Sequence, residues 1–196
     1  MDYVNSESIY LKEAEWKFFL SGLGFTEIYG VFSMEKEETD NREQIHQMLV
    51  DLYLRKVIAC EENRIYVLPP ISEFLKLMQK NKKCVLLRKC GSEHPIKCCY
   101  LAENTVLVME KSQREKASIR LCQMTFEAWL GYVLEEIEEN EEMQFFVQDS
   151  RKDILYEKII YKEDGIRELL IIETDAGQIQ KEYQPDFLIE KIKNWM

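Results

Sequence analysis

The sequence has little of what acid–base and nucleophilic catalysis use. Only two of its 196 residues are histidine, His46 and His94, and it contains no Gly-x-Ser-x-Gly segment. A hydrolase needs a positioned base beside its nucleophile, and imidazole is the commonest base near neutral pH. The glutamates between 135 and 142 form a run, and such runs are usually the solvated face of a helix. We therefore expect a protein that is not an enzyme.

Long apolar runs and a targeting pattern are missing as well. The N-terminal segment MDYVNSESIYLKEAEW is acidic and has no basic stretch followed by an apolar one, and no segment reaches the length of a membrane span. The chain has 36 acidic and 26 basic residues, which gives a formal net charge of -10. This charge disfavours general binding to polyanions. We expect a cytoplasmic protein with no membrane or nucleic-acid partner.

The six cysteines include no Cys-x-x-Cys pair. They stand at 60, 84, 90, 98, 99 and 122, mostly inside apolar or strand-like segments, and are expected to be reduced and partly buried. In KCGSEHPIKCCY, the soft ligands Cys90, His94 and Cys98 are close enough to be weak zinc candidates. Against zinc, Cys98 and Cys99 would point to opposite faces of a strand that Pro95 begins. A turn flanked by strand cysteines is the favoured interpretation, with neither metal nor cofactor.

Helical spacing is present at five places. Between 12 and 23, apolar residues recur at i, i+3, i+4 and i+7, and the glycines at 22 and 24 supply a C-terminal stop for this helix. Because a phosphate-binding loop needs a strand before it, these glycines indicate a helix end. Further helices are expected to begin near Asp40, Pro70, Phe126 and Pro185. In the one from Phe126, an apolar stripe that includes Trp129 and Val133 is expected to face the core.

Strand-like segments fill much of the remaining chain. They are Val57–Cys60, Arg64–Leu68, KCVLLRKC, IKCCYLA, TVLVMEK, SIRLCQM, ILYEKIIY, IRELLIIET and QIQKEY. Short β-forming segments joined by turn-like residues favour antiparallel pairing. The sequence therefore predicts an α+β fold, a mostly antiparallel β-sheet flanked by helices, with a winged-helix-like N-terminal part. One domain over 1–196 is the simplest organisation, and two loosely similar lobes divided near 138–142 are the alternative.

The winged-helix-like part raises the question of DNA binding. In a winged helix, the helix before the hairpin enters the major groove and the wing contacts phosphate. Here the expected wing is Glu61-Glu62-Asn63, with only Arg64 beside it, and Glu43 and Asp51 stand on the preceding helix. An acidic wing is a poor phosphate contact, so a protein partner is favoured over DNA.

The segment FTEIYGVF offers candidates for a partner-binding surface. Ile28, Tyr29, Val31 and Phe32 are the apolar residues left over when the helical stripes and inward strand faces have been assigned to the core. An exposed apolar patch made of such residues would mark a docking site. The alternative is that the segment plugs the core beneath the first two helices.

The order of segments resembles the EspG family of type VII secretion chaperones. The resemblance runs through LKEAEWKFFLSGLG, LYLRKVIACEENRIYVLPPISEFLKLM, CVLLRK, CCYLAENTVLVMEK and SIRLCQM. It consists of spacing and apolar pattern, without a short motif, and the chain is shorter than typical members. Membership would imply a cytosolic, non-catalytic α+β protein that covers an apolar tip of a helical secretion substrate.

These observations favour a non-catalytic cytosolic adaptor or chaperone that binds a helical protein partner, with a type VII secretion substrate as the candidate. Two alternatives remain open. One is an immunity-type or regulatory protein that binds a toxin, and the other is a winged-helix DNA-binding regulator. The sequence makes no prediction of the oligomeric state.

Overall fold

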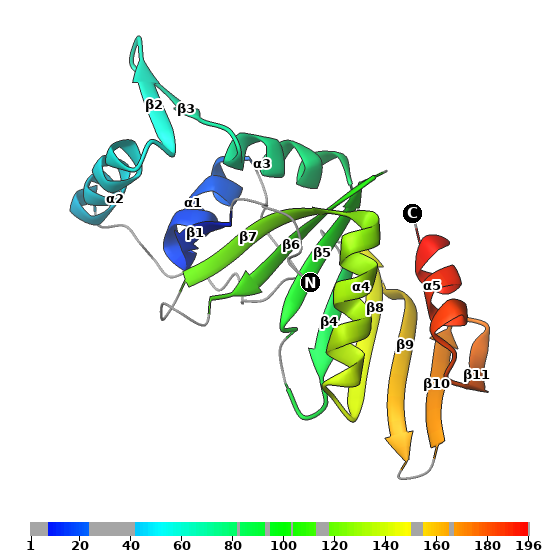
Figure 1. Cartoon of the computed structure of the whole chain (residues 1–196). Coiled ribbons are helices and arrows are strands. Elements are labelled where there is room, and N and C mark those ends of the chain that lie inside the picture. Colours follow the sequence, from blue (N-terminus) through cyan, green and yellow to red (C-terminus); the bar gives the residue numbers. More distant parts are fainter. Residues whose placement is uncertain are drawn as a thin grey trace.

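The computed structural model describes residues 8–23, 42–81, 83–92, 95–102, 104–112, 118–149, 155–164 and 167–195. Within these ranges the chain forms five helices, one nine-stranded sheet and one two-stranded hairpin (Figure 1). The helices are α1 (Glu13–Gly22), α2 (Arg42–Leu54), α3 (Ile71–Lys80), α4 (Phe126–Glu138) and α5 (Pro185–Lys193). The strands are β1 (Ile9–Lys12), β2 (Ile58–Glu61), β3 (Arg64–Val67), β4 (Lys83–Lys89), β5 (Lys97–Ala102), β6 (Thr105–Lys111), β7 (Ser118–Thr125), β8 (Glu142–Asp149), β9 (Leu155–Asp164), β10 (Arg167–Thr174) and β11 (Gly177–Glu182).

The large sheet is antiparallel at every neighbouring pair. Its strand order is β1-β7-β6-β5-β4-β8-β9-β10-β11, and β2 and β3 form the separate hairpin. The prediction of an α+β fold with a mostly antiparallel sheet is therefore confirmed. The sheet continues without a break from β4 to β8, across the predicted division near 138–142, and the number of domains stays a prediction.

Helices cover both faces of the sheet. Along β4, Cys84 and Leu86 belong to the core that packs with α1 and α3, whereas Val85 and Leu87 belong to the core beneath α4 and α5. This alternation follows from the strand period of two residues. We call the two sides the α3 face and the α4 face.

The α3 face is closed by two amphipathic helices. The apolar side chains that recur at helical spacing on α3, Ile71, Phe74, Leu75 and Met78, are all buried. On α1, Trp16 and Leu20 are fully buried. The backbone N–H of Lys12 donates to the Glu15 carboxylate at 2.8 Å, which satisfies one of the donors that an N-terminal helix end leaves free.

The α4 face is closed by α4 over the strands from β7 to β8 and by α5 over the last strands (Figure 1). Thr125 caps α4, because its side-chain oxygen accepts from the Ala128 N–H at 3.2 Å. Trp129, Val133 and Ile137 are buried, as the apolar stripe predicted. On α5, Pro185 occupies the first turn, where its missing N–H costs little, and the helix buries Leu188 and Ile192.

Two strands were not predicted, and one of them is central. The glutamate run between 135 and 142 was interpreted as the face of a helix, yet its last residue begins β8, which pairs with β4 on one side and β9 on the other. Its segment EMQFFVQD begins with the last glutamate of the acidic run and includes polar residues that are themselves buried, Gln148 and Asp149. Strand β1 is short and precedes α1 directly, so the helical pattern concealed it.

Trp129→Ala should lower the free energy of unfolding by about 3–5 kcal/mol, because a large buried side chain would leave a cavity. The matched control is Glu138→Ala on the exposed side of the same helix. This variant should change the free energy of unfolding by less than about 0.5 kcal/mol. Urea denaturation of the three proteins measures both values. Equal stabilities would show that the α4 stripe does not hold the core together.

Candidate functional site

The sequence-predicted docking residues cannot be placed. Ile28, Tyr29, Val31 and Phe32 lie outside the described residues. Both interpretations of this segment, docking patch and core plug, therefore stay predictions.

The three weak metal candidates are not brought together by the described residues. Cys90 is exposed just after β4, Cys98 is fully buried on β5, and His94 lies outside the described ranges. A hydrogen bond with the side chain of Cys84 and burial both raise the pKa of Cys98. Burial also raises the pKa of Cys99 on the opposite face. Protonated thiols are poor ligands and poor nucleophiles, and the part of the chain that the structure describes contains no group of three His, Cys, Asp or Glu side chains placed for a metal.

A helix and a hairpin project from the body of the molecule. We call residues 42–67, which comprise α2, β2 and β3, the α2–hairpin unit (Figure 1). Leu52 and Ile58 are buried in the core of the α3 face and attach the unit to the body. A guanidinium nitrogen of Arg55 also lies 2.7 Å from the carboxylate of Glu15, whose side chain is only 1% exposed. The attachment therefore combines apolar contact with a charge-assisted hydrogen bond.

One side of α2 is apolar and faces solvent. Val50, Tyr53 and Leu54 stand at i, i+3 and i+4, with 37%, 54% and 70% of their surface exposed. The other side of the helix, with Met48, Leu49 and Leu52, packs on the core. Leucine and tyrosine left this exposed on a projecting helix are the elements of an interaction surface.

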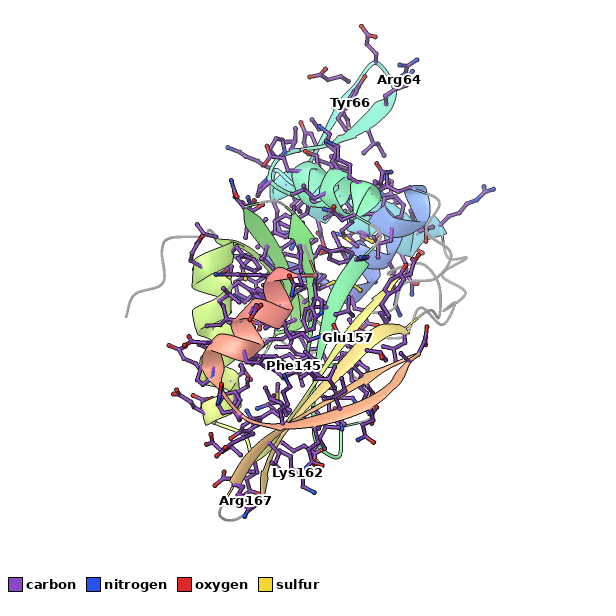
Figure 2. All side chains as sticks on the ribbon, turned by 90° about the vertical axis from the view of Figure 1, so that its right-hand side faces the viewer. Arg64, Tyr66, Phe145, Glu157, Lys162 and Arg167 are labelled. Carbon is purple, nitrogen blue, oxygen red and sulfur yellow. The ribbon has the colours of Figure 1, made fainter. Side chains whose placement is uncertain are left out.

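The hairpin ends in a tight turn with an acidic tip. Glu62 and Asn63 have positive φ angles of 49° and 62°, the conformation that a two-residue hairpin of type I′ requires. Figure 2 shows Arg64 and Tyr66 near this tip, away from the sheet. The predicted helix and hairpin are present, but a winged-helix domain is not confirmed.

A second feature is a charged cluster at the end of the α4 face. Four side chains form one row across adjacent strands, because Lys97 on β5 is opposite Glu110 on β6, Glu110 is opposite Arg120 on β7, and Arg120 is opposite Tyr10 on β1. Opposite charges directly across an antiparallel pair stabilise the sheet. Helix α4 adds Tyr132 and Glu136 above the row.

The contacts in this cluster are close. The Lys97 ammonium is hydrogen-bonded to Glu136, lies 3.8 Å from Glu110, and stands 3.8 Å from the centre of the Tyr132 ring. Glu110 accepts from Arg120 at 2.7 Å and from the Tyr132 hydroxyl at 3.1 Å. The Lys97 side chain is 8% exposed, and those of Glu110 and Glu136 are 14% exposed. Groups buried to this degree interact more strongly than surface ion pairs do.

The cluster lies beside an open groove with a volume of about 1170 Å³. The strand row and α4 line one part of this groove, and its other lining residues include Ser8, Lys89 and Lys111. Burial raises the pKa of Tyr132, and the negative charges of Glu110 and Glu136 raise it further. Tyr132 is therefore a neutral hydrogen-bond donor to Glu110 over the physiological range.

Sequence reasoning did not assemble this cluster. Its residues come from four strands and one helix, so no local spacing connects them. One signal was present: Lys97 and Arg120 each stand among apolar residues of a strand segment, and Glu110 directly follows one. Charged residues inside buried strands are rare unless they are paired.

No family model matches the chain, and comparison with curated proteins finds no match either. The resemblance to EspG chaperones thus depends on the sequence pattern alone. The chain is an α+β protein in which an antiparallel sheet predominates. None of the helices in the described ranges has both the length and the apolar character needed to cross a membrane.

Lys97→Ala should lower the free energy of unfolding by about 3–5 kcal/mol, because it leaves two largely buried carboxylates without their shared cation. Replacing the pair together, with Lys97→Met and Glu136→Leu, should recover much of the loss. The matched control is Lys158→Ala, since the Lys158–Glu173 pair has side-chain exposures of 20% and 41%. This control should lower the free energy of unfolding by about 0–1 kcal/mol. An equal loss in Lys97→Ala and Lys158→Ala would contradict a special role for the buried cluster.

Stability above pH 10 should depend on Tyr132. An unfolded tyrosine has a pKa of about 10, so above this pH the unfolded chain loses a proton that the folded chain keeps, and folding becomes less favourable as pH rises. Tyr132→Phe removes this contribution. The free energy of unfolding should then fall less steeply with pH, by up to about 1.4 kcal/mol per pH unit. Urea denaturation of both proteins at several values above and below pH 10 measures the slopes. Parallel slopes would show that Tyr132 titrates normally.

Proposed function

We propose that the protein is a non-catalytic binding protein, an adaptor or chaperone, that holds a helical segment of a protein partner on α2. The observation that carries this proposal is the solvent-exposed row of Val50, Tyr53 and Leu54 on a helix that projects from the body.

The spacing of the row suits a helix as the partner. Side chains at i, i+3 and i+4 form ridges that fit the grooves of a second helix. Tyr53 and Leu54 are the anchors, because aromatic and large aliphatic side chains contribute most when they are buried at an interface. A helical partner would bury this row and leave the opposite side of α2, which packs on the core, undisturbed.

The charge of the unit supports an apolar mode of recognition. Residues 42–64 contain four basic and four acidic side chains, whereas the whole chain has a net charge of -10. Because the α2–hairpin unit is neutral, it does not attract polycations. The acidic remainder of the chain repels other acidic molecules. The partner is therefore a helix with an apolar stripe and with neutral or basic flanks.

The proposal agrees with what the EspG resemblance implies. A chaperone that covers the apolar tip of a secretion substrate needs an exposed apolar surface of its own. A type VII secretion substrate is accordingly the partner that we propose to test first for binding. The proposal also includes that the protein is not an enzyme. It is supported by the ion pairs that Lys97 forms with Glu110 and Glu136, which occupy these charged groups.

Co-expression with the helical products of neighbouring genes should yield a stoichiometric complex. In the variant Tyr53→Ser/Leu54→Ser, the dissociation constant should rise at least tenfold, which corresponds to about 1.4 kcal/mol or more. Both side chains are exposed, so the melting temperature should change little. Calorimetric titration measures the binding constant, and light scattering separates a partner complex from self-association of the chain.

The matched control is Ile179→Ser, which removes an apolar side chain that is 57% exposed on β11. It should leave partner binding unchanged. A complex that survives the α2 double variant and is lost in the control would place the interface at the β11 edge and refute α2 as the docking surface. Tight binding to duplex DNA in place of a protein would restore the regulator hypothesis.

A further inference from the structure

We propose that the groove beside the charged cluster is a binding site for a small, multiply charged oxyanion, a molecule with carboxylate or phosphate groups. The proposal is independent of the α2 surface.

The charge of the groove is opposite to that of the protein. Its lining contains four cations, Lys89, Lys97, Lys111 and Arg120, and two carboxylates, Glu110 and Glu136. The whole chain has ten more acidic than basic residues. A local excess of positive charge in a recess is focused by its low-dielectric walls and attracts anions.

The inner charges are already paired. Lys97 contacts both carboxylates, and Arg120 donates to Glu110, so the two cations and the two carboxylates neutralise one another. This inner group needs no ligand for its own stability. It serves as a fixed wall that holds Arg120 and Tyr132 in place.

The outer charges have no such partners. Neither Lys89 nor Lys111 forms an ion pair with another residue of the described ranges, and both are exposed. Arg120 uses Nε for Ser8 and one terminal nitrogen for Glu110, so its other terminal nitrogen remains without a partner among the described residues. Lys89, Lys111 and one terminal nitrogen of Arg120 therefore line the groove without such pairing.

The hydroxyl of Ser8 completes the donor set. Its oxygen accepts from Arg120 Nε at 3.0 Å, so its own hydrogen must point away from the guanidinium. Ser8 and Arg120 thus offer adjacent donors to the same acceptor. Oxyanions are recognised by convergent charge-assisted donors of this kind.

The size of the groove suits a small molecule. Its volume of about 1170 Å³ is slightly above the range of about 300–1,000 Å³ typical of small-ligand sites, which leaves room for bridging water. Because the donors are distributed around the groove, a ligand with two or more anionic groups would engage more of them than a single anion.

Titration with citrate and with inorganic pyrophosphate tests the proposal. Calorimetry at low ionic strength should show micromolar binding of at least one probe. Binding of citrate alone assigns the site to carboxylates, binding of pyrophosphate alone assigns it to phosphates, and binding of both supports the shared oxyanion chemistry. Failure of both probes to bind at millimolar concentration would overturn the proposal.

A pair of double variants shows whether the groove is responsible. Lys89→Ala/Lys111→Ala should weaken binding at least tenfold. The matched control is Lys76→Ala/Lys80→Ala, which removes the same charge from two exposed positions on α3. The control should weaken binding less than threefold, and equal losses would show non-specific attraction to positive charge.

Amide chemical shifts of the unmodified protein give a second measurement that does not depend on how the variants fold. The perturbations caused by the probe should centre on Ser8, Lys89, Lys111 and Arg120. Perturbations confined to other surfaces would refute this location, even if binding itself is observed.

Discussion

The pairing of β4 with β8 is the interaction on which the rest of the molecule depends. It places Leu86 opposite Phe146 and Leu87 opposite Phe145, and so joins strands that β5, β6, β7 and α4 separate in the sequence. Because neighbouring residues of a strand point to opposite faces, the same register decides which side chains enter the core under α3 and which enter the core under α4. A shift by one residue would move each set to the opposite face, beneath helices with which it does not fit. The helices fit their respective faces only in this register.

Much of the fold follows from periodicity that the sequence displays. The stripes on α3 and α4 are local, and the residues that they assign to the core are buried. β8 was harder because it lies between two strands and buries polar as well as apolar residues, including Gln148 and Asp149. Its first residue, Glu142, also ends the glutamate run, whose composition is typical of the exposed face of a helix. Period and composition thus gave conflicting signals at a strand in the interior of the sheet.

The candidate surfaces were less accessible to sequence reasoning than the core was. On α2, one apolar side packs on the body and the other faces solvent, and the sequence alone cannot say which of two apolar sides will be covered. The charged cluster depends on the registers of β5, β6, β7 and β1, which bring together residues more than a hundred positions apart, such as Ser8 and Arg120. Such contacts follow from topology, and no local pattern encodes them. The docking segment proposed from sequence lies outside the described residues and remains a prediction.

The two candidate surfaces use different physics, and this difference has a structural cause. The α2–hairpin unit is attached at its base by Leu52, Ile58 and the Arg55–Glu15 contact, so its outer side can be apolar without disturbing the core. The groove lies at the end of a sheet layer, where α4 no longer covers the strands with apolar side chains and charged residues take their place. Apolar recognition on a projection and ionic recognition in a recess therefore occupy separate parts of the fold. Since the buried pairs beside the groove are neutral as a group, a change of ionic strength should act on the outer lysines and leave the α2 surface largely unaffected.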